Sequence, residues 1–248
     1  MHGYGQALET KSIVCPGLLN HILLDQISAH NGFGLLRRFR GAGFERLISD
    51  LFNPLFVPPL VIGSLAWMLD LDGLTISWVL AAAILFYTVI PLAGTFYLLN
   101  AQKISSIDLP EQKSRTGLYV LGVGSAFTAF VIFRFMHFYT HSLIPIVALV
   151  YFLNAASGLF INLKWKMSIH SAGISSAAAI FLFFSEFQGQ ALIPNGDILS
   201  LIILLLLLPL MFWSRYRLNI HSLGELVGGA STGFLLTLLE LSILINLW

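Results

Sequence analysis

The sequence predicts an all-α fold: a polytopic membrane helix bundle of about six to seven transmembrane helices, with an N-terminal amphipathic helix. Of its 248 residues, 57% are hydrophobic and only 10% are charged, whereas soluble domains carry about 25% charged residues. The mean hydropathy is +0.84. Apolar stretches of about 20 residues recur along the chain, and a helix of that length spans a membrane with all its backbone hydrogen bonds satisfied.

Residues 1–52 are predicted to form a leader outside the bilayer core. Between Phe33 and Leu51, apolar residues alternate with arginines, as at Arg37, Arg38 and Arg46. This pattern is typical of a basic amphipathic helix lying on a membrane surface. A solvated leader with an accidental apolar stripe is the alternative interpretation. The leader lacks the charged, apolar and small-residue pattern of a cleaved signal peptide.

Residues 53–248 are predicted to form the transmembrane domain. Its fifth and sixth apolar segments are the shortest, and the first contains Pro58 and Pro59, so one of these segments could be tilted or broken. The predicted segments are Pro54–Leu71, Ile76–Leu99, Thr116–Phe138, Ser142–Leu163, Ile169–Phe187, Ile198–Trp213 and His221–Leu247.

The basic residues indicate how these segments are oriented. All of the 13 Lys and Arg residues except Arg134 fall in the leader or in loops on the leader's side of the membrane. The positive-inside rule makes that side cytoplasmic. We therefore expect a multi-pass integral protein of a bacterial inner membrane, with its polar face toward the cytoplasm.

Three polar stretches reach the membrane at this same face: Lys113–Arg115, Lys164–His170 and Ser214–Glu225. Arg and Lys suit phosphate, and a Ser hydroxyl at a helix start adds a neutral donor. His221 and Glu225 are four residues apart at a helix start, so the carboxylate could hold one imidazole nitrogen and leave the other free to attack phosphorus. The lysines could instead be membrane anchors, and His221 an ordinary polar residue at a helix start.

These residues also carry a family resemblance. Ser214-Arg215, five residues, His221, three residues and then Glu225 resembles the third motif of the type 2 phosphatidic acid phosphatase superfamily of membrane lipid phosphatases. Ser168-x-His170 resembles its second motif, and Lys113-x-Arg115 stands where its first motif should be. The chain departs from the family pattern by having Glu225 in place of Asp, Met167 and Ile169 in place of Pro and Gly, and Asp108 and Thr116 in place of Lys and Pro.

The resemblance implies a metal-independent phosphatase without cofactors that acts through a phosphohistidine. His221 would be the nucleophile, Glu225 its orienting acid and His170 the general acid. The implied phosphate-binding residues are Arg215, Arg115, Lys113 and Ser168, and the position of Lys166 makes it a further candidate.

The expected partners are a lipid phosphate or diphosphate, of isoprenyl or glycerolipid type, and membrane lipids. A net charge of +1 gives no reason to expect nucleic acid, and the single Cys15 allows neither an internal disulfide nor a cysteine-based metal site. The main alternative is a catalytically inactive family member that binds anionic lipid or acts as an assembly partner. A membrane prenyltransferase is disfavoured because it needs acidic pairs for magnesium, whereas the loops on this side offer only Asp108 and Glu111.

Overall fold

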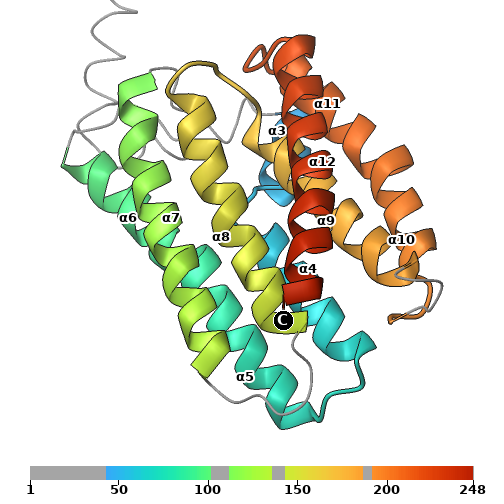
Figure 1. Ribbon diagram of the computed structural model, residues 1–248. Helices are drawn as coiled ribbons and strands as arrows, with labels where there is room; N and C mark the ends of the chain where they lie inside the picture. Colours follow the sequence, from blue (N-terminus) through green and yellow to red (C-terminus); the bar gives the residue numbers. More distant parts are fainter. Residues whose placement is uncertain (1–42, 102–111, 136–142, 187–191, 248) are drawn as a thin grey trace, which may run out of the picture. The chain divides into compact units, whose positions relative to one another are not determined.

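The structure is a computed structural model that describes residues 43–101, 112–135, 143–186 and 192–247, with side chains from residue 116 onward in the second range. The chain divides into two units, Met1–Gly43 and Phe44–Trp248, and the described helices belong to the second unit. All its described regular elements are helical, which confirms the predicted fold class (Figure 1). They are α3 (Phe44–Leu51), α4 (Val57–Met68), α5 (Gly73–Ile84), η1 (Leu85–Val89), α6 (Ile90–Asn100), α7 (Gln112–Phe135), α8 (Leu143–Asn162), α9 (Ile169–Glu186), α10 (Gly196–Ile202), η3 (Ile203–Leu207), α11 (Leu208–Arg217) and α12 (Leu223–Leu247).

Six helical stretches are long and apolar enough to cross a membrane, so the chain is a multi-pass membrane protein. The first expected segment is instead the 12-residue α4, with prolines in its first turn. At about 1.5 Å per residue it is shorter than a hydrocarbon core about 30 Å thick. The six spans are Gly73–Asn100, Thr116–Phe135, Leu143–Asn162, Ile169–Glu186, Gly196–Arg217 and Leu223–Leu247.

Of the predicted amphipathic leader helix, only its last part, α3, lies within the described residues. Phe44, Leu47 and Leu51 are exposed on α3, whereas Ile48 and Ser49 are buried. The helix packs against α11 and groups with the bundle. The expected domain boundary after residue 52 therefore falls inside the second unit, Phe44–Trp248. Helix α3 belongs to the same unit as the bundle and can contribute side chains to a site there.

Two long spans contain a π-helical turn just before a proline. Both η1 and η3 end two residues before a proline, Pro91 or Pro209. A proline has no N–H to give to the preceding turn, so the helix widens there without ending. Gly73–Asn100 and Gly196–Arg217 are thus each one continuous span.

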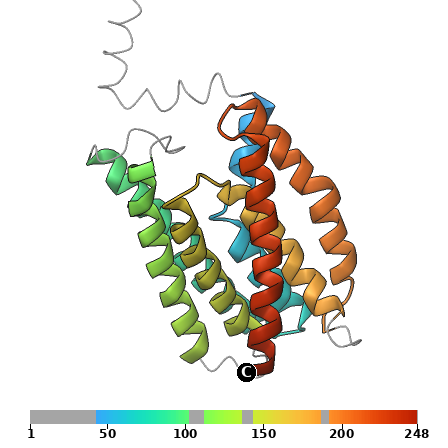
Figure 2. The same ribbon diagram turned by 45° about the horizontal axis from the view of Figure 1, so that its top comes forward.

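Helix α9 is the most buried span and lies next to α12 and α10 (Figures 1 and 2). Two glycines let α12 approach it closely. A Cβ on Gly229 would lie 2.3 Å from the Ser168 carbonyl oxygen, and one on Gly233 would lie 2.2 Å from that of Ala172. Small residues permit such contact between membrane helices. The N-terminus of α9 is therefore placed beside the N-terminal half of α12.

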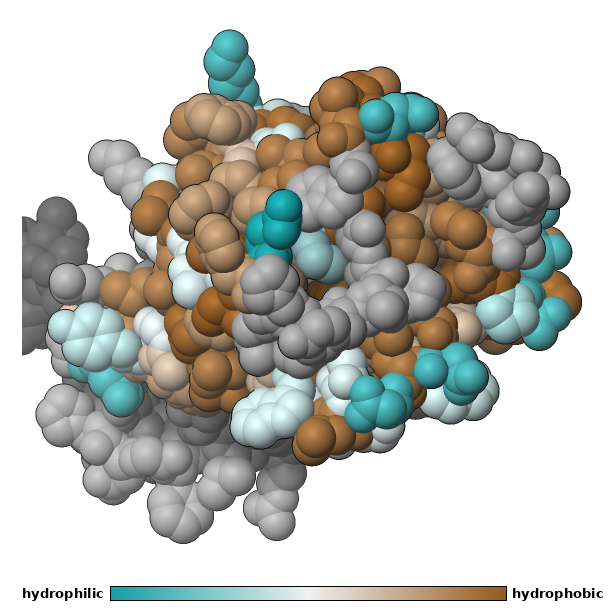
Figure 3. All heavy atoms as spheres, turned by 60° about the horizontal axis from the view of Figure 1, so that its bottom comes forward, coloured by the Kyte–Doolittle hydropathy of each residue, from teal (hydrophilic) through white to brown (hydrophobic). Residues whose placement is uncertain are grey.

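Much of the outer surface is apolar, as expected for a surface in contact with lipid. Trp67, Leu205 and Leu235 are all more than 60% exposed. Figure 3, viewed from the end of the bundle where α12 finishes, shows extensive hydrophobic areas interrupted by isolated hydrophilic residues. A water-soluble monomer rarely exposes so much contiguous apolar surface.

Candidate active site

The short turn between α11 and α12 fixes the position of His221. Helix α11 ends in a Schellman motif, in which Ile220 N–H donates to the Arg215 carbonyl at 3.2 Å and Asn219 N–H donates to the Tyr216 carbonyl at 3.0 Å. Asn219 adopts the left-handed φ of 53° that this motif requires. His221 follows two residues later, so its backbone is held by the end of one helix.

The start of α12 holds His221 from the other side through a capping box. Ser222 Oγ accepts the Glu225 N–H at 3.3 Å, and Glu225 Oε2 accepts the Ser222 N–H at 3.1 Å. The same Oε2 lies 2.9 Å from His221 Nδ1. A carboxylate is an acceptor, so Nδ1 carries the proton and Nε2 carries the lone pair. The cap thus sets both the orientation and the tautomer of the imidazole.

His221 is neutral at physiological pH. Burial lowers the pKa of His221 to about 4, and it outweighs the opposing effect of the hydrogen bond to Glu225. The positive charges of Arg215 and Lys166 lower the pKa of His221 further. A neutral imidazole with an oriented Nε2 lone pair is the form required for a nucleophile.

The polar stretch Lys164–His170 lies next to the stretch Ser214–Glu225, as expected from their placement on the same side of the membrane. His170 lies in the first turn of α9 and is buried, near enough to Arg215, His221 and Arg46 to interact with them electrostatically. Its Nδ1 is buried and has no hydrogen-bond partner among the described residues. His170 therefore offers a nitrogen to whatever occupies the space in front of it.

Ser168 lies at the N-terminus of α9, as its sequence position predicts. It is fully buried, and its Oγ accepts the Ser171 N–H at 3.3 Å and the Ser171 hydroxyl at 3.0 Å. These are the contacts of an N-cap for α9. Its own N–H donates to the Glu225 carbonyl at 3.1 Å. In this structure Ser168 joins α9 to α12, and its predicted phosphate contact stays a prediction.

Two predicted cations lie at the site. Arg215 is 4% exposed, and its Nη1 donates to Ser49 Oγ on α3 at 2.8 Å. Lys166 Nζ donates to the Ile220 carbonyl at 2.8 Å, which ties the α8–α9 connection to the turn before His221. Both cations are thus held in place by neighbouring elements.

The remaining two predicted cations, Lys113 and Arg115, fall in the first turn of α7. Their side chains lie outside the described residues, so their predicted phosphate contacts stay predictions. Within the residues that the structure describes, no group of three or more His, Cys, Asp or Glu side chains is arranged to hold a metal ion.

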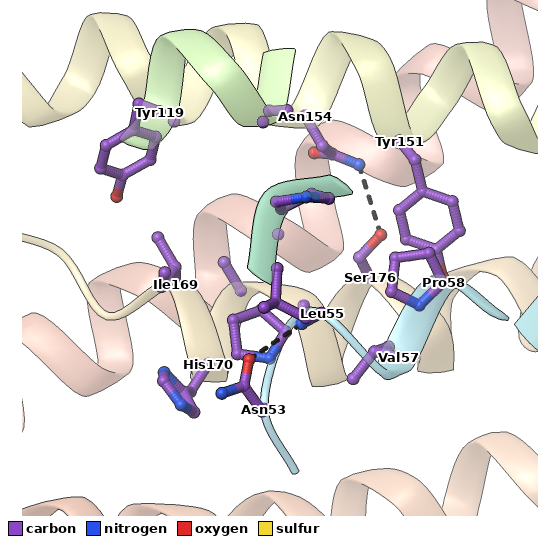
Figure 4. Close-up of a pocket in the computed structure, with 18 of the residues that line it drawn as sticks. Asn53, Leu55, Val57, Pro58, Tyr119, Tyr151, Asn154, Ile169, His170 and Ser176 are labelled. Carbon is purple, nitrogen blue, oxygen red and sulfur yellow. Dashed lines mark hydrogen bonds between the residues drawn. The ribbon is translucent and has the colours of Figure 1, made fainter. Parts of the chain in front are cut away.

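A cavity of about 340 Å³ joins these side chains. One part of its wall is polar and contains both histidines, and Figure 4 shows His170 there beside Asn53. The rest is formed mostly by apolar residues of α4, η1, α7 and α8 inside the bundle. The polar wall includes Arg46, Asp50, Asn53, Lys166, His170, Arg215 and His221, and the apolar wall includes Leu55, Val57, Phe86, Leu118, Ala126 and Leu236.

The sequence did not identify the contribution of α3 to this site. Arg46 lines the cavity and pairs with Asp50, with 3.2 Å between Arg46 Nε and Asp50 Oδ1. Ser49, on the same helix, holds Arg215. The arginine pattern of the leader revealed an amphipathic helix, but no local spacing relates that helix to residues more than 160 positions later.

The arrangement combines a neutral, oriented imidazole, a second histidine and several cations at the mouth of an apolar cavity. Such a site can bind an anionic headgroup and bring a nucleophilic nitrogen to it. In comparisons with family models, curated proteins and solved structures, no match to the chain was found.

Proposed function

We propose that this chain is a membrane-embedded phosphatase that hydrolyses a lipid phosphate or diphosphate through a phosphohistidine intermediate. The observation that carries the proposal is the His221–Glu225 pair, with 2.9 Å between Nδ1 and Oε2, at a cavity that also contains His170, Arg215 and Lys166. The resemblance of these residues to the motifs of the type 2 phosphatidic acid phosphatase superfamily supports the same chemistry.

In the first step, His221 Nε2 attacks phosphorus, and the bond from phosphorus to the leaving oxygen breaks. His170 donates a proton to that oxygen, while Arg215 and Lys166 stabilise the negative charge on the equatorial oxygens. Glu225 stabilises the positive charge that develops on the imidazole. In the second step, water attacks the phosphohistidine, His170 takes up a proton from that water, and inorganic phosphate leaves.

The shape of the cavity supports an amphiphilic substrate. Its polar wall is suited to a phosphate, while its apolar wall is suited to a hydrocarbon tail that stays at membrane depth. Isoprenyl and glycerolipid phosphates both have this form. With the leader's positive charges toward the cytoplasm of a bacterial inner membrane, the headgroup would be hydrolysed on the cytoplasmic side.

Purified protein should release inorganic phosphate from at least one member of a panel of lipid phosphates, equally with and without a chelator. His221→Ala and His170→Ala should abolish or strongly reduce that release, and acid-labile radiolabelled phosphate should accumulate on the wild type but not on His221→Ala. If the wild type releases no phosphate from any member of the panel, the proposal fails.

A catalytically inactive protein that binds anionic lipid or assists membrane assembly is the second candidate. It is favoured by the bond from Arg215 Nη1 to Ser49 Oγ, which engages one donor of the guanidinium with the protein itself. Such a protein would bind the lipid phosphates of the panel without releasing phosphate.

A further inference from the structure

Deep in the cavity, the hydroxyl of Tyr151 lacks a hydrogen-bond partner. Tyr151 lies on α8, is 7% exposed and lines the cavity. Its hydroxyl oxygen is fully buried and has no partner among the described residues. An unpaired buried hydroxyl is unfavourable, and buried polar groups in proteins are nearly always paired. The free hydroxyl therefore indicates a ligand that supplies the missing acceptor.

Hydrogen-bonded polar side chains also line the part of the cavity near Tyr151. On the same helix, Asn154 Nδ2 donates to Thr237 Oγ1 at 2.8 Å and to Ser176 Oγ at 3.3 Å, and the two hydroxyl oxygens lie 2.8 Å apart. Asn154 and Ser176 also line the cavity. Three helices thus maintain a polar network within the membrane-spanning region, beside a tyrosine that still has a donor to offer.

The distance from the phosphate-binding end fits a second polar group of the same ligand. Ser176 follows His170 by six residues on α9, which is about 9 Å along a helix axis. In Figure 4, Tyr151 and the Asn154–Ser176 pair lie on one side of the drawn pocket, and His170 lies on the other. In a glycerolipid phosphate, the ester carbonyl lies a few bonds beyond the phosphate ester, whereas an isoprenyl phosphate has only hydrocarbon there.

We propose that the Tyr151 hydroxyl donates to an ester carbonyl of the substrate, so that the cavity selects acyl glycerolipid phosphates over isoprenyl phosphates. The inference rests on the proposed function and names the substrate class of the same site. Tyr151 acts as a specificity residue. It takes no part in the chemical step, so its removal affects the choice of substrate more than the capacity to hydrolyse phosphate.

The test compares two lysophosphatidates of equal chain length that differ only in an ester or an ether link to glycerol, with a matched isoprenyl monophosphate as a third substrate. Wild type should show a kcat/KM for the ester at least about fivefold above that for the ether, the effect of one hydrogen bond of about 1 kcal/mol. Tyr151→Phe, which keeps the ring that packs edge-on against Tyr87 at 5.7 Å, should abolish this preference and leave the isoprenyl rate unchanged.

Tyr87→Phe is the matched control, because the Tyr87 hydroxyl already donates to the Ala148 carbonyl at 3.4 Å. It should retain the ester preference. Equal wild-type rates for ester and ether, or a preference that survives Tyr151→Phe, would overturn the inference and leave the phosphatase proposal standing.

If wild type hydrolyses none of the three lipids, the inference is decided by binding, and the phosphatase proposal is decided by the wider panel of lipid phosphates and diphosphates. Retention of each radiolabelled lipid on immobilised protein then gives the ester-to-ether ratio directly. A ratio of at least about fivefold that falls to one in Tyr151→Phe supports the subsite. A wild-type ratio near one refutes it.

Discussion

Helices α5 and α12 both begin with a carboxylate cap, yet the two caps differ in what else they hold. At α5, Asp72 is exposed, and its carboxylate accepts the Leu74 and Thr75 N–H groups at 3.0 and 3.1 Å together with the Thr75 hydroxyl. The Thr75 hydroxyl is the main reason that the pKa of Asp72 is below its usual value. All these partners belong to the helix that the residue caps.

At α12, one oxygen of Glu225 serves both the helix and a side chain outside it. Oε2 accepts the Ser222 N–H, as a capping box requires, and also faces Nδ1 of His221. Helix capping alone accounts for the bond to Ser222 but not for an imidazole at the wall of a cavity. Asp72 therefore only caps a helix, whereas Glu225 caps a helix and also positions an imidazole. Substitutions at the two caps test this distinction.

The largest effect is expected for His221→Ala. With a phosphohistidine mechanism, loss of the nucleophile should reduce kcat by at least about 10⁴-fold, since removal of a nucleophile from a working unit leaves only residual catalysis. Single-turnover phosphate release measures it. The capping box of α12 remains intact, so the melting temperature should stay close to that of the wild type.

Asp72→Ala is the matched change at the other cap. It removes the acceptor for two N–H groups of α5 and should lower the melting temperature while leaving kcat unchanged. A His221→Ala protein that retains wild-type turnover would remove the distinction between the two caps.

Glu225→Gln is expected to have the next largest effect. An amide can present an N–H to Nδ1 and so favour the wrong tautomer, and the neutral amide no longer stabilises an imidazolium. By analogy with other oriented histidines, kcat should fall by about 10²- to 10⁴-fold with little change in KM. An equal rise in KM with unchanged kcat would assign Glu225 to binding instead.

Two arginines, Arg46 and Arg217, differ in their relation to the cavity, and this difference makes Arg46 testable. Arg46 lines the cavity, whereas Arg217 on α11 is 63% exposed and lies 4.0 Å from Glu45. If Arg46 contacts the phosphate, Arg46→Ala should lower kcat/KM by about 10²-fold, and Arg217→Ala should change it less than about twofold. Equal losses in both variants would indicate a general effect of positive charge at the membrane surface.

The pH dependence of kcat/KM reports on His221, which only the α12 cap contacts. The pKa of His221 is lowered to about 4, so the neutral nucleophile persists through neutral pH and is lost as the pH falls through about 4. The acidic limb of log kcat/KM against pH should therefore have an apparent pKa near 4, well below the ordinary value of about 6.5.

The same shift predicts a loss of stability in acid. Because the unfolded chain binds a proton on this histidine at a higher pH than the folded chain, stability falls between about pH 6.5 and pH 4. His221→Gln should remove that part of the pH dependence of the melting temperature. An acidic limb near 6.5 would show that the imidazole is more solvated than the structure indicates.

What the sequence predicted well depends on local spacing. Apolar runs of membrane length determined the spans, and an i, i+4 separation at a helix start placed His221 beside Glu225. The predicted start of the fifth segment at Ile169 is also where α9 begins. The membrane side of each loop then brought His170 and His221 to one face.

What the sequence did not predict depends on contacts between distant segments. The bond from Arg215 to Ser49 and that from the Ser214 hydroxyl to the Glu45 carbonyl join α11 to α3 across more than 160 residues. No periodicity in either segment encodes that contact, so the place of Arg46 at the cavity could not be derived. Likewise, the shortness of α4 follows from its first-turn prolines and from the turn after Met68, which hydropathy alone does not resolve.

The smallest effect is expected for Ser222→Ala, which separates the two roles of the α12 cap. It removes the Oγ acceptor for the Glu225 N–H and should lower the free energy of unfolding by about 1 kcal/mol, as for other N-caps. The Ser222 N–H and the Glu225 carboxylate remain, so the imidazole stays oriented and kcat should fall less than about tenfold. Urea unfolding and turnover of the same preparation measure the two quantities. A fall in kcat as large as that of Glu225→Gln would mean that the capping box as a whole, and not its carboxylate alone, holds His221 in place.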